Sequence, residues 1–250
     1  MISEFPLFVY TTLAGIAAGG YVARAIVPLK ADRKAPWLFA LACLAMLGIG
    51  GVALLGHLGQ PLRVLNAFSN LGAGITQEGI TTVLFGIAVL ADFVFCIAKK
   101  DSPRWLVAVA AVLGVVMTIT MGLAYNGLVG TPAWANPATI PFFVVADLAM
   151  GAGFYLAFNP DALADRALSA YGIAAYALAA VCVIAVGVHF AGLGYSVAPF
   201  AIGAVLLACA CALAVVARKG GKAWAAWAIL ACAVVGVAVA RYAFYAASVI

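Results

Sequence analysis

Eight long apolar runs, separated by short polar loops, constrain this chain more than any other feature. A helix needs about 20 apolar residues to cross the hydrocarbon core of a bilayer. The runs occupy residues 6–27, 37–57, 79–98, 105–124, 140–158, 168–191, 196–217 and 223–242. The sequence therefore predicts an all-α integral membrane protein with eight transmembrane helices, forming one membrane domain over residues 1–250. Eight helices are compatible with two four-helix bundles.

The composition excludes several other classes of protein. The chain is 68% hydrophobic and only 8% charged, far less charged than a soluble domain of this length. Its apolar residues run continuously instead of alternating, which favours helices over a membrane barrel. No basic stripe with interleaved aromatic residues accompanies the net charge of +5, so no nucleic-acid partner is expected. No loop is long enough to fold as a domain, so soluble chemistry has to come from a partner.

Basic residues are concentrated in alternate loops, which predicts an orientation. The first, third, fifth and seventh loops hold ten of the thirteen lysines and arginines: Lys30, Arg33, Lys34, Lys99, Lys100, Arg104, Arg166, Arg218, Lys219 and Lys222. The second loop holds only Arg63. Because basic loops stay cytoplasmic, we expect a multi-pass protein of the cytoplasmic membrane. Both termini and the second, fourth and sixth loops should lie on the extracytoplasmic side.

A polar patch connects the second and third runs on that predicted outer side. His57 ends one run, and Glu78 lies just before the next. An imidazole and a carboxylate at neighbouring helix ends are a pair of proton acceptors suited to a redox molecule dissolved in lipid. Arg63 and Asn66, in the loop between them, are candidates to orient a ring oxygen. The alternative is that His57 and Glu78 are only interfacial residues wetted by headgroup water.

Four charged residues fall inside the apolar runs, where an unpaired charge is costly. Arg24 and Asp92 are predicted at similar depth and form a candidate structural ion pair. Asp147 and Arg241 are both predicted in the outer third of the membrane. They form a second candidate pair, although Arg241 could instead line a redox pocket with Tyr242 and Tyr245.

Metal sites are not expected in this chain. All six cysteines lie in the apolar runs without C-x-x-C spacing, which argues against an iron–sulfur cluster or a zinc site. The two histidines, His57 and His189, are both predicted near the outer surface. They could ligate at most one b-type haem, and we expect a haem-free subunit.

Several segments together resemble the DmsC family, the membrane-anchor subunits of anaerobic dimethyl sulfoxide reductases. The family opens with an acidic residue or histidine before an aromatic-Pro-Leu sequence, and here this is residues 4–7. A His-Leu-Gly-x-Pro-x-Arg-x-x-Asn segment corresponds to residues 57–66, and a glutamate opening the third helix corresponds to Glu78. Tyr125-Asn126 with Thr131-Pro132-Ala133-Trp134 resembles the family's fourth loop, and residues 241–245 resemble the end of its last helix.

The resemblance implies a function for the whole chain. Members of the family oxidise menaquinol and anchor two soluble subunits, an iron–sulfur electron-transfer subunit and a molybdopterin catalytic subunit. Their histidine and glutamate are associated with menaquinol binding, which implies that His57 and Glu78 are the proton-handling residues. Arg63, Asn66, Tyr125 and Arg241 are the further candidate quinol-binding residues. A subunit of this kind completes no reaction alone, so whether to class it as an enzyme stays open. The rival hypothesis is a small transporter or channel without a redox role, which the absence of a central proline in the helices disfavours.

Overall fold

A computed structural model describes residues 4–29, 35–57, 70–99, 101–219 and 223–247, and it excludes the side chain of His57. These residues contain eight helices that are long and apolar enough to cross a membrane, as predicted. The same residues contain no strand. The elements are α1 (Phe5–Ile26), α2 (Trp37–His57), α4 (Gly74–Lys99), α5 (Arg104–Asn126), α6 (Thr139–Phe158), the 3-10 helix η2 (Pro160–Ala164), α7 (Arg166–Gly192), α8 (Ala198–Ala217) and α9 (Ala223–Ala246).

Helix α4 begins earlier than hydropathy predicted, at Gly74 instead of residue 79. Its first turns carry Thr76, Gln77 and Glu78, whose polar side chains lie just before the apolar run of residues 79–98. The backbone is nevertheless helical there, because the N–H groups of Thr76 and Gln77 donate to the carbonyl of Ala73 at 3.0 and 3.1 Å. A helix can begin in the headgroup region before its apolar residues start, so Glu78 belongs to the helix instead of preceding it.

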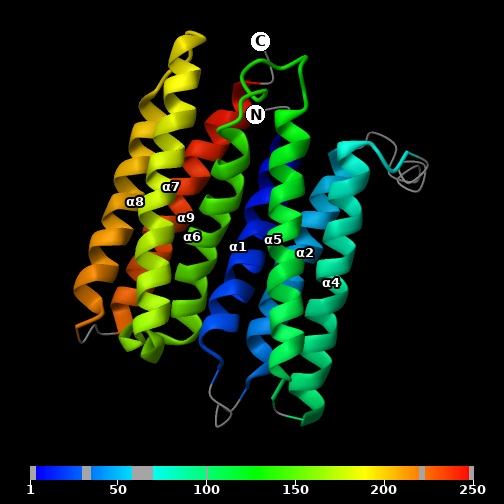
Figure 1. The fold of residues 1–250 in the computed structure, drawn as a ribbon, viewed down its shortest axis with the longest axis vertical. Coiled ribbons are helices and arrows are strands. Elements are labelled where there is room, and N and C mark those ends of the chain that lie inside the picture. The colour runs from blue at the N-terminus through cyan, green and yellow to red at the C-terminus, as the bar shows by residue number, and fades with distance from the viewer. Residues whose placement is uncertain (1–3, 30–34, 58–69, 100, 220–222, 248–250) are drawn as a thin grey trace.

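The helices contact one another in two rings of four. Helices α1, α2, α4 and α5 pack in sequence order, and α5 returns to α1. Helices α6, α7, α8 and α9 repeat this pattern, with α9 returning to α6. The two rings meet mainly where α1 packs against α6, and these helices lie side by side in the middle of the molecule (Figure 1).

Glycines bring α1 and α6 into backbone contact. A Cβ atom added to Gly19 would lie 2.1 Å from the carbonyl oxygen of Asp147, and one added to Gly151 would lie 2.1 Å from the carbonyl carbon of Gly19. A Cβ on Gly15 would collide with the Asp147 side chain. Small residues let membrane helices approach closely and gain van der Waals contact. The two glycines of Gly15-x-x-x-Gly19 therefore lie in the contact surface between the two rings of helices.

The predicted pairing of Arg24 with Asp92 is confirmed. The two side chains form an ion pair between α1 and α4 and are almost completely buried. Arg24 Nη2 donates to Asp92 Oδ1 at 3.1 Å, and the Tyr21 hydroxyl donates to Oδ2 at 2.6 Å. Because each charge is compensated by its partner, the pair fixes the register of α1 against α4 without leaving a lone charge in the membrane.

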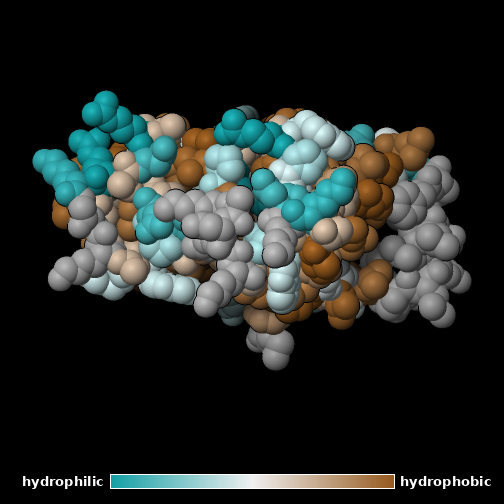
Figure 2. Space-filling view, turned by 90° about the horizontal axis from the view of Figure 1, so that it is seen from below, coloured by the Kyte–Doolittle hydropathy of each residue, from teal (hydrophilic) through white to brown (hydrophobic). Residues whose placement is uncertain are grey.

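The two ends of the molecule differ in character. Helix α1 begins and α9 ends at the same end as the α5–α6 connection and the start of α4 (Figure 1). The opposite end carries Lys99, Arg104, Arg166, Arg218 and Lys219 on the described parts of the odd-numbered loops and their flanks. Viewed from that end, hydrophilic side chains gather on the α7–α8 side and over the middle of the face, while apolar side chains reach the rim (Figure 2).

Candidate functional site

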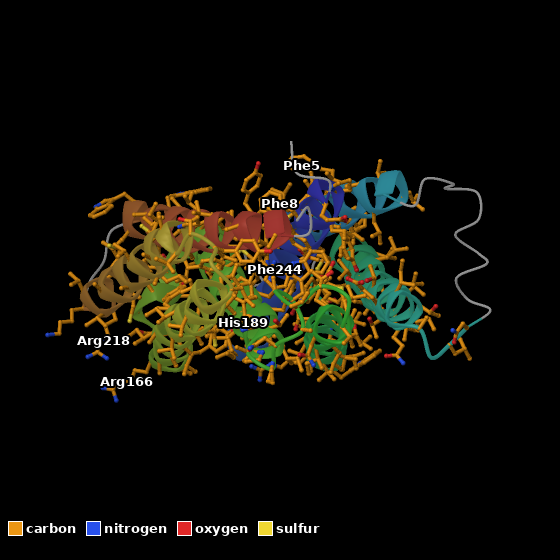
Figure 3. All side chains as sticks on the ribbon, turned by 90° about the horizontal axis from the view of Figure 1, so that it is seen from above. Phe5, Phe8, Arg166, His189, Arg218 and Phe244 are labelled. Carbon is orange, nitrogen blue, oxygen red and sulfur yellow. The ribbon has the colours of Figure 1, made fainter. Side chains whose placement is uncertain are left out.

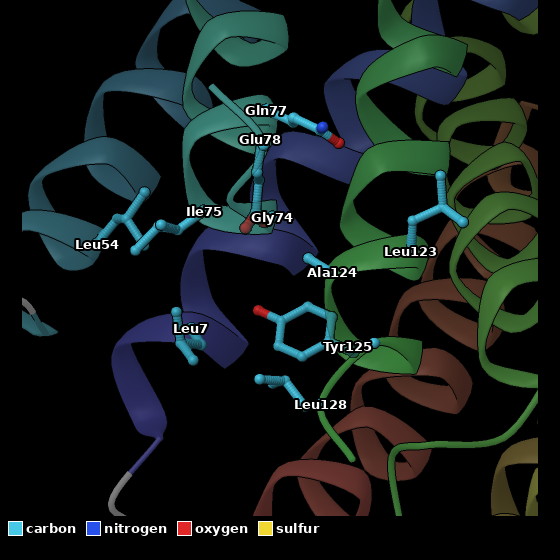
Figure 4. Close-up of a pocket in the computed structure, with 12 residues that line it drawn as sticks. Leu7, Leu54, Gly74, Ile75, Gln77, Glu78, Leu123, Ala124, Tyr125 and Leu128 are labelled. Carbon is cyan, nitrogen blue, oxygen red and sulfur yellow. The ribbon is translucent and has the colours of Figure 1, made fainter. Parts of the chain in front are cut away.

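A pocket of about 590 Å³ opens at the end of the molecule where α4 begins. It lies within the first ring of helices, among the start of α1, the end of α2, the start of α4 and the end of α5 (Figure 4). Its lining is mostly apolar and consists of Leu7, Leu54, Gly72, Gly74, Ile75, Gln77, Glu78, Leu123, Ala124, Tyr125, Gly127 and Leu128. A cavity of this size, apolar with few polar groups, is typical of a small-molecule site.

Among the described residues, Glu78 is the only carboxylate that lines this pocket. It lies in the second turn of α4, and its side chain is directed into the pocket on the side that faces Tyr125 (Figure 4). The residue is only 5% exposed, and its Oε1 atom is buried without a hydrogen-bond partner in the described part of the chain. A buried polar atom without a partner is costly. A ligand hydroxyl that donated to this oxygen would remove that cost.

Tyr125 lies across the pocket from Glu78, in the last turn of α5. Its ring stacks on Phe143 at 5.1 Å between centroids and meets Trp134 and Tyr245 edge-on at 5.5 and 5.4 Å. These contacts hold the ring, and its hydroxyl points towards the pocket (Figure 4). The structure therefore brings together two of the predicted site residues, Glu78 and Tyr125. Their roles in binding stay predictions.

The aromatic support of Tyr125 comes from segments far apart in the sequence. Trp134, in the α5–α6 connection, donates its indole N–H to the carbonyl of Phe244 at 2.7 Å and stacks on the Phe244 ring. The hydroxyl of Thr139 in turn donates to the Trp134 carbonyl at 2.8 Å. The fourth loop and the end of α9, which the sequence singled out separately, thus form one cluster behind the pocket.

Arg241 does not line this pocket. It is fully buried, and its Nη2 atom contacts Asp147 Oδ1 at 2.6 Å, which confirms the predicted ion pair. Its Nη1 atom donates to the carbonyl of Thr11 at 2.9 Å, and its guanidinium lies 4.6 Å from the centre of the Phe143 ring. This geometry favours the structural alternative over a direct role in quinol binding. Arg241 ties α9 to α1 and α6.

The remaining predicted site residues lie wholly or partly outside the described part of the protein. Arg63 and Asn66 lie outside the described residues, as does the side chain of His57. The backbone of His57 ends α2, one helical turn beyond the pocket-lining Leu54. That position is compatible with the predicted role, which stays a prediction.

His189 lies at the end of α7, in the second ring. Its Nε2 atom is 3.0 Å from the carbonyl oxygen of Pro132. Among the described residues, no group of three or more histidine, cysteine or acidic side chains could hold a metal ion. Whether the subunit binds haem stays a prediction.

Sequence reasoning missed most of the lining. Leu54, Ile75, Leu123 and Leu128 are apolar residues in or beside apolar helices, and nothing in the sequence separates them from residues that face lipid. Among the lining residues that were not predicted, Leu7 and Gln77 lie in segments that the sequence analysis singled out. Leu7 closes the aromatic-Pro-Leu opening, and Gln77 precedes Glu78 in the polar patch.

Comparison with known proteins identifies what this protein is similar to. The family model "DMSO reductase anchor subunit (DmsC)" matches residues 1–246. The protein is 31% identical over 142 residues to the C subunit of the anaerobic dimethyl sulfoxide reductase of Escherichia coli, which is 52% of this protein and 49% of that subunit. It is 27% identical over 145 residues to the corresponding C subunit of Haemophilus influenzae, covering 54% and 51% of the two sequences. It is 28% identical over 151 residues to the anaerobic dimethyl sulfoxide reductase subunit YnfH of Escherichia coli, covering 56% and 52%. The matches thus span about half the length of these curated relatives.

Proposed function

This protein belongs to the DMSO reductase anchor subunit family, and from that premise we propose that it oxidises menaquinol in the pocket beside Glu78. The electrons pass to an iron–sulfur subunit docked at the same end of the molecule, which supplies a molybdopterin catalytic subunit. The observation that supports this most is the buried Oε1 of Glu78, which has no partner among the described residues and lies in an apolar pocket at a helix end. Such a pocket suits a flat apolar ring that carries hydroxyl groups.

The proposed reaction releases two protons and two electrons from each quinol. Glu78 accepts the proton of the hydroxyl that hydrogen-bonds to it, and His57 accepts the proton of the other. Removal of these protons raises the electron density of the ring and favours its oxidation. Tyr125 positions the ring with its hydroxyl, and Arg63 and Asn66 orient a ring oxygen from the loop. The apolar lining keeps bulk water away from the reacting oxygens.

The orientation of the subunit follows from its charge. We propose that the basic end faces the cytoplasm, because basic loops are retained there, and that the pocket and both termini face the extracytoplasmic side. The rings of contacting helices support two four-helix bundles, with the pocket in the first. Protons from quinol are then released outside, where the partner subunits also dock.

This orientation predicts the labelling pattern of single cysteines. Val129, beside the pocket and 83% exposed, should react after Val129→Cys substitution with a membrane-impermeant reagent added to intact cells. Asp101, exposed in the α4–α5 connection at the basic end, should react after Asp101→Cys substitution only when the membrane is opened. If Asp101→Cys were labelled in intact cells and Val129→Cys were not, the orientation would be the opposite of the one proposed.

Bulk added to the pocket should weaken quinol binding. Leu54 lines the pocket, whereas Val52 on the same helix is highly exposed and does not. A tryptophan here would occupy space that the quinol ring needs, so Leu54→Trp should lower the affinity for a quinol analogue by roughly tenfold or more, a loss of about 1.4 kcal/mol or more in binding free energy. Val52→Trp should leave it unchanged. A fluorescence titration of the assembled complex measures both, and equal affinities in the two variants would move the site elsewhere.

A further inference from the structure

A second pocket, distant from the quinol site, lies at the basic end between the start of α7 and the end of α8. Its volume is about 490 Å³, and it is lined by Ala164, Asp165, Arg166, Ser169, Ala170, Arg218 and Lys219. Arg166 and Arg218 lie close together at one corner of the molecule, with their guanidinium groups directed outward (Figure 3). The proposed quinol chemistry gives this corner no role.

The pocket has an excess of uncompensated positive charge. In the part of the protein that the structure describes, Arg166, Arg218 and Lys219 form no ion pair. The one carboxylate among the described lining residues, Asp165, is already used as the N-cap of α7. Its Oδ1 atom accepts the N–H groups of Ala167 and Leu168, both at 2.9 Å. Three cationic residues therefore line a cavity whose acidic lining residue is already hydrogen-bonded to the backbone.

Two further features point to an anionic ligand with hydrogen-bond acceptors. Ser169 lines the pocket, and its hydroxyl is buried without a hydrogen-bond partner among the described residues, so it is a donor left free for a ligand. The pocket also lies at the N-terminal end of α7, where the helix dipole favours negative charge. A phosphate group supplies several acceptor oxygens and at least one negative charge, and so satisfies the cations and the hydroxyl together.

The position of the pocket favours a lipid as the source of that phosphate. Arg166 begins one transmembrane helix and Arg218 follows the last residue of another, so both lie at the level of the headgroups. Val216, near the end of α8, is 73% exposed, and the surrounding faces of α7 and α8 present further apolar side chains. A lipid with its phosphate in the pocket would lay its acyl chains along that apolar face.

We propose that this pocket binds the headgroup phosphate of an anionic phospholipid. Arg166 and Arg218 contact the phosphate oxygens through their planar guanidinium groups, which suit phosphate geometry. Lys219 adds charge, and Ser169 donates a hydrogen bond. Basic pockets between transmembrane helices recognise such headgroups in other membrane proteins. The proposal is independent of the quinol site.

The test compares two double variants that remove the same charge from the same end of the molecule. Arg166→Gln/Arg218→Gln changes the pocket, whereas Lys99→Gln/Arg104→Gln changes exposed cations outside it. The purified full-length protein, in neutral detergent micelles, is titrated with phosphatidylglycerol, phosphatidylcholine and inorganic phosphate. Each Lys or Arg near an anionic headgroup contributes about fivefold to binding. The pocket variant should therefore bind phosphatidylglycerol about 25-fold more weakly than the unmodified protein, and the control should match the unmodified protein.

Each result decides the proposal. Equal losses in the two double variants would show general charge attraction, and equal binding of phosphatidylcholine would show that the headgroup charge is not recognised. Binding of inorganic phosphate as tight as that of the lipid would assign the pocket to a free anion. Arg218→Gln alone changes an exposed side chain and should fold normally. An unchanged affinity for phosphatidylglycerol in this single variant would also overturn the proposal, and a loss of about fivefold would support it.

Discussion

Glu78→Gln should reduce menaquinol-dependent turnover of the assembled complex by about 10²–10⁴-fold, the usual contribution of a general base. The substitution keeps the shape of the side chain but removes its ability to accept a proton. It should not harm folding, because a neutral amide is easier to bury in a membrane than a carboxylate. The measurement is the rate of quinol oxidation per assembled complex, with the amount of subunit in the membrane as the folding check.

Asp101→Asn is the matched control for this substitution. It also exchanges a carboxylate for an amide, but at the exposed α4–α5 connection near the opposite end of the molecule. Turnover in this variant should equal that of the unmodified complex. Near-normal turnover in the Glu78→Gln complex would show that another group accepts the protons. His57 would then be the first candidate, because its backbone lies one turn beyond Leu54.

Arg241→Gln should strongly destabilise the subunit. The substitution leaves Asp147 buried between α1 and α6 without its cation, and it removes the contacts to Thr11 and Phe143. Removing one partner of a buried ion pair lowers the free energy of unfolding by about 3–5 kcal/mol. The expected result is a lower thermal unfolding temperature in detergent and less subunit in the membrane. Folded protein that remains should bind a quinol analogue normally, because Arg241 does not line the pocket.

The double variant Asp147→Asn/Arg241→Gln separates a structural role from a binding role. It removes both charges, so it should recover much of the stability that Arg241→Gln alone loses. A single variant with normal stability but lost quinol binding would contradict the structural assignment. It would instead restore the prediction that Arg241 is a quinol-binding residue.

Hydropathy predicted the number of membrane helices well, because a run of about 20 apolar residues has few alternatives in a bilayer. It failed at the start of α4, where polar side chains conceal helical backbone that begins at Gly74. The close contact between α1 and α6 could not be predicted from the sequence either. In a protein with 26 glycines, the Gly15-x-x-x-Gly19 spacing carries little information until its neighbour on α6 is known.

The candidate site was predictable where the proposed chemistry requires unusual residues. Glu78 stood out because a carboxylate at the end of a membrane helix needs a reason, and Tyr125 stood out because its segment resembles the family's fourth loop. The apolar lining did not stand out, because Leu54 and Leu123 resemble residues that face lipid. The buried ion pairs were only partly predictable from the sequence. Depth alone suggested that Asp147 and Arg241 could meet, but only the packing of α9 against α6 separated a structural pair from a pocket residue.

The central claim, that quinol binds beside Glu78, is tested most directly by photolabelling. A photoreactive menaquinone analogue is activated on the intact complex in membranes, and the labelled peptides are identified by mass spectrometry. We expect labels on the start of α4 and the end of α5, near Gln77 and Tyr125, and excess menaquinol should suppress them. An apolar groove lined by Ile16, Met46, Phe154, Trp227, Leu230, Ala231, Val234 and Val235 offers a competing surface. Suppressible labels confined to that groove, with none on α4 or α5, would contradict the account.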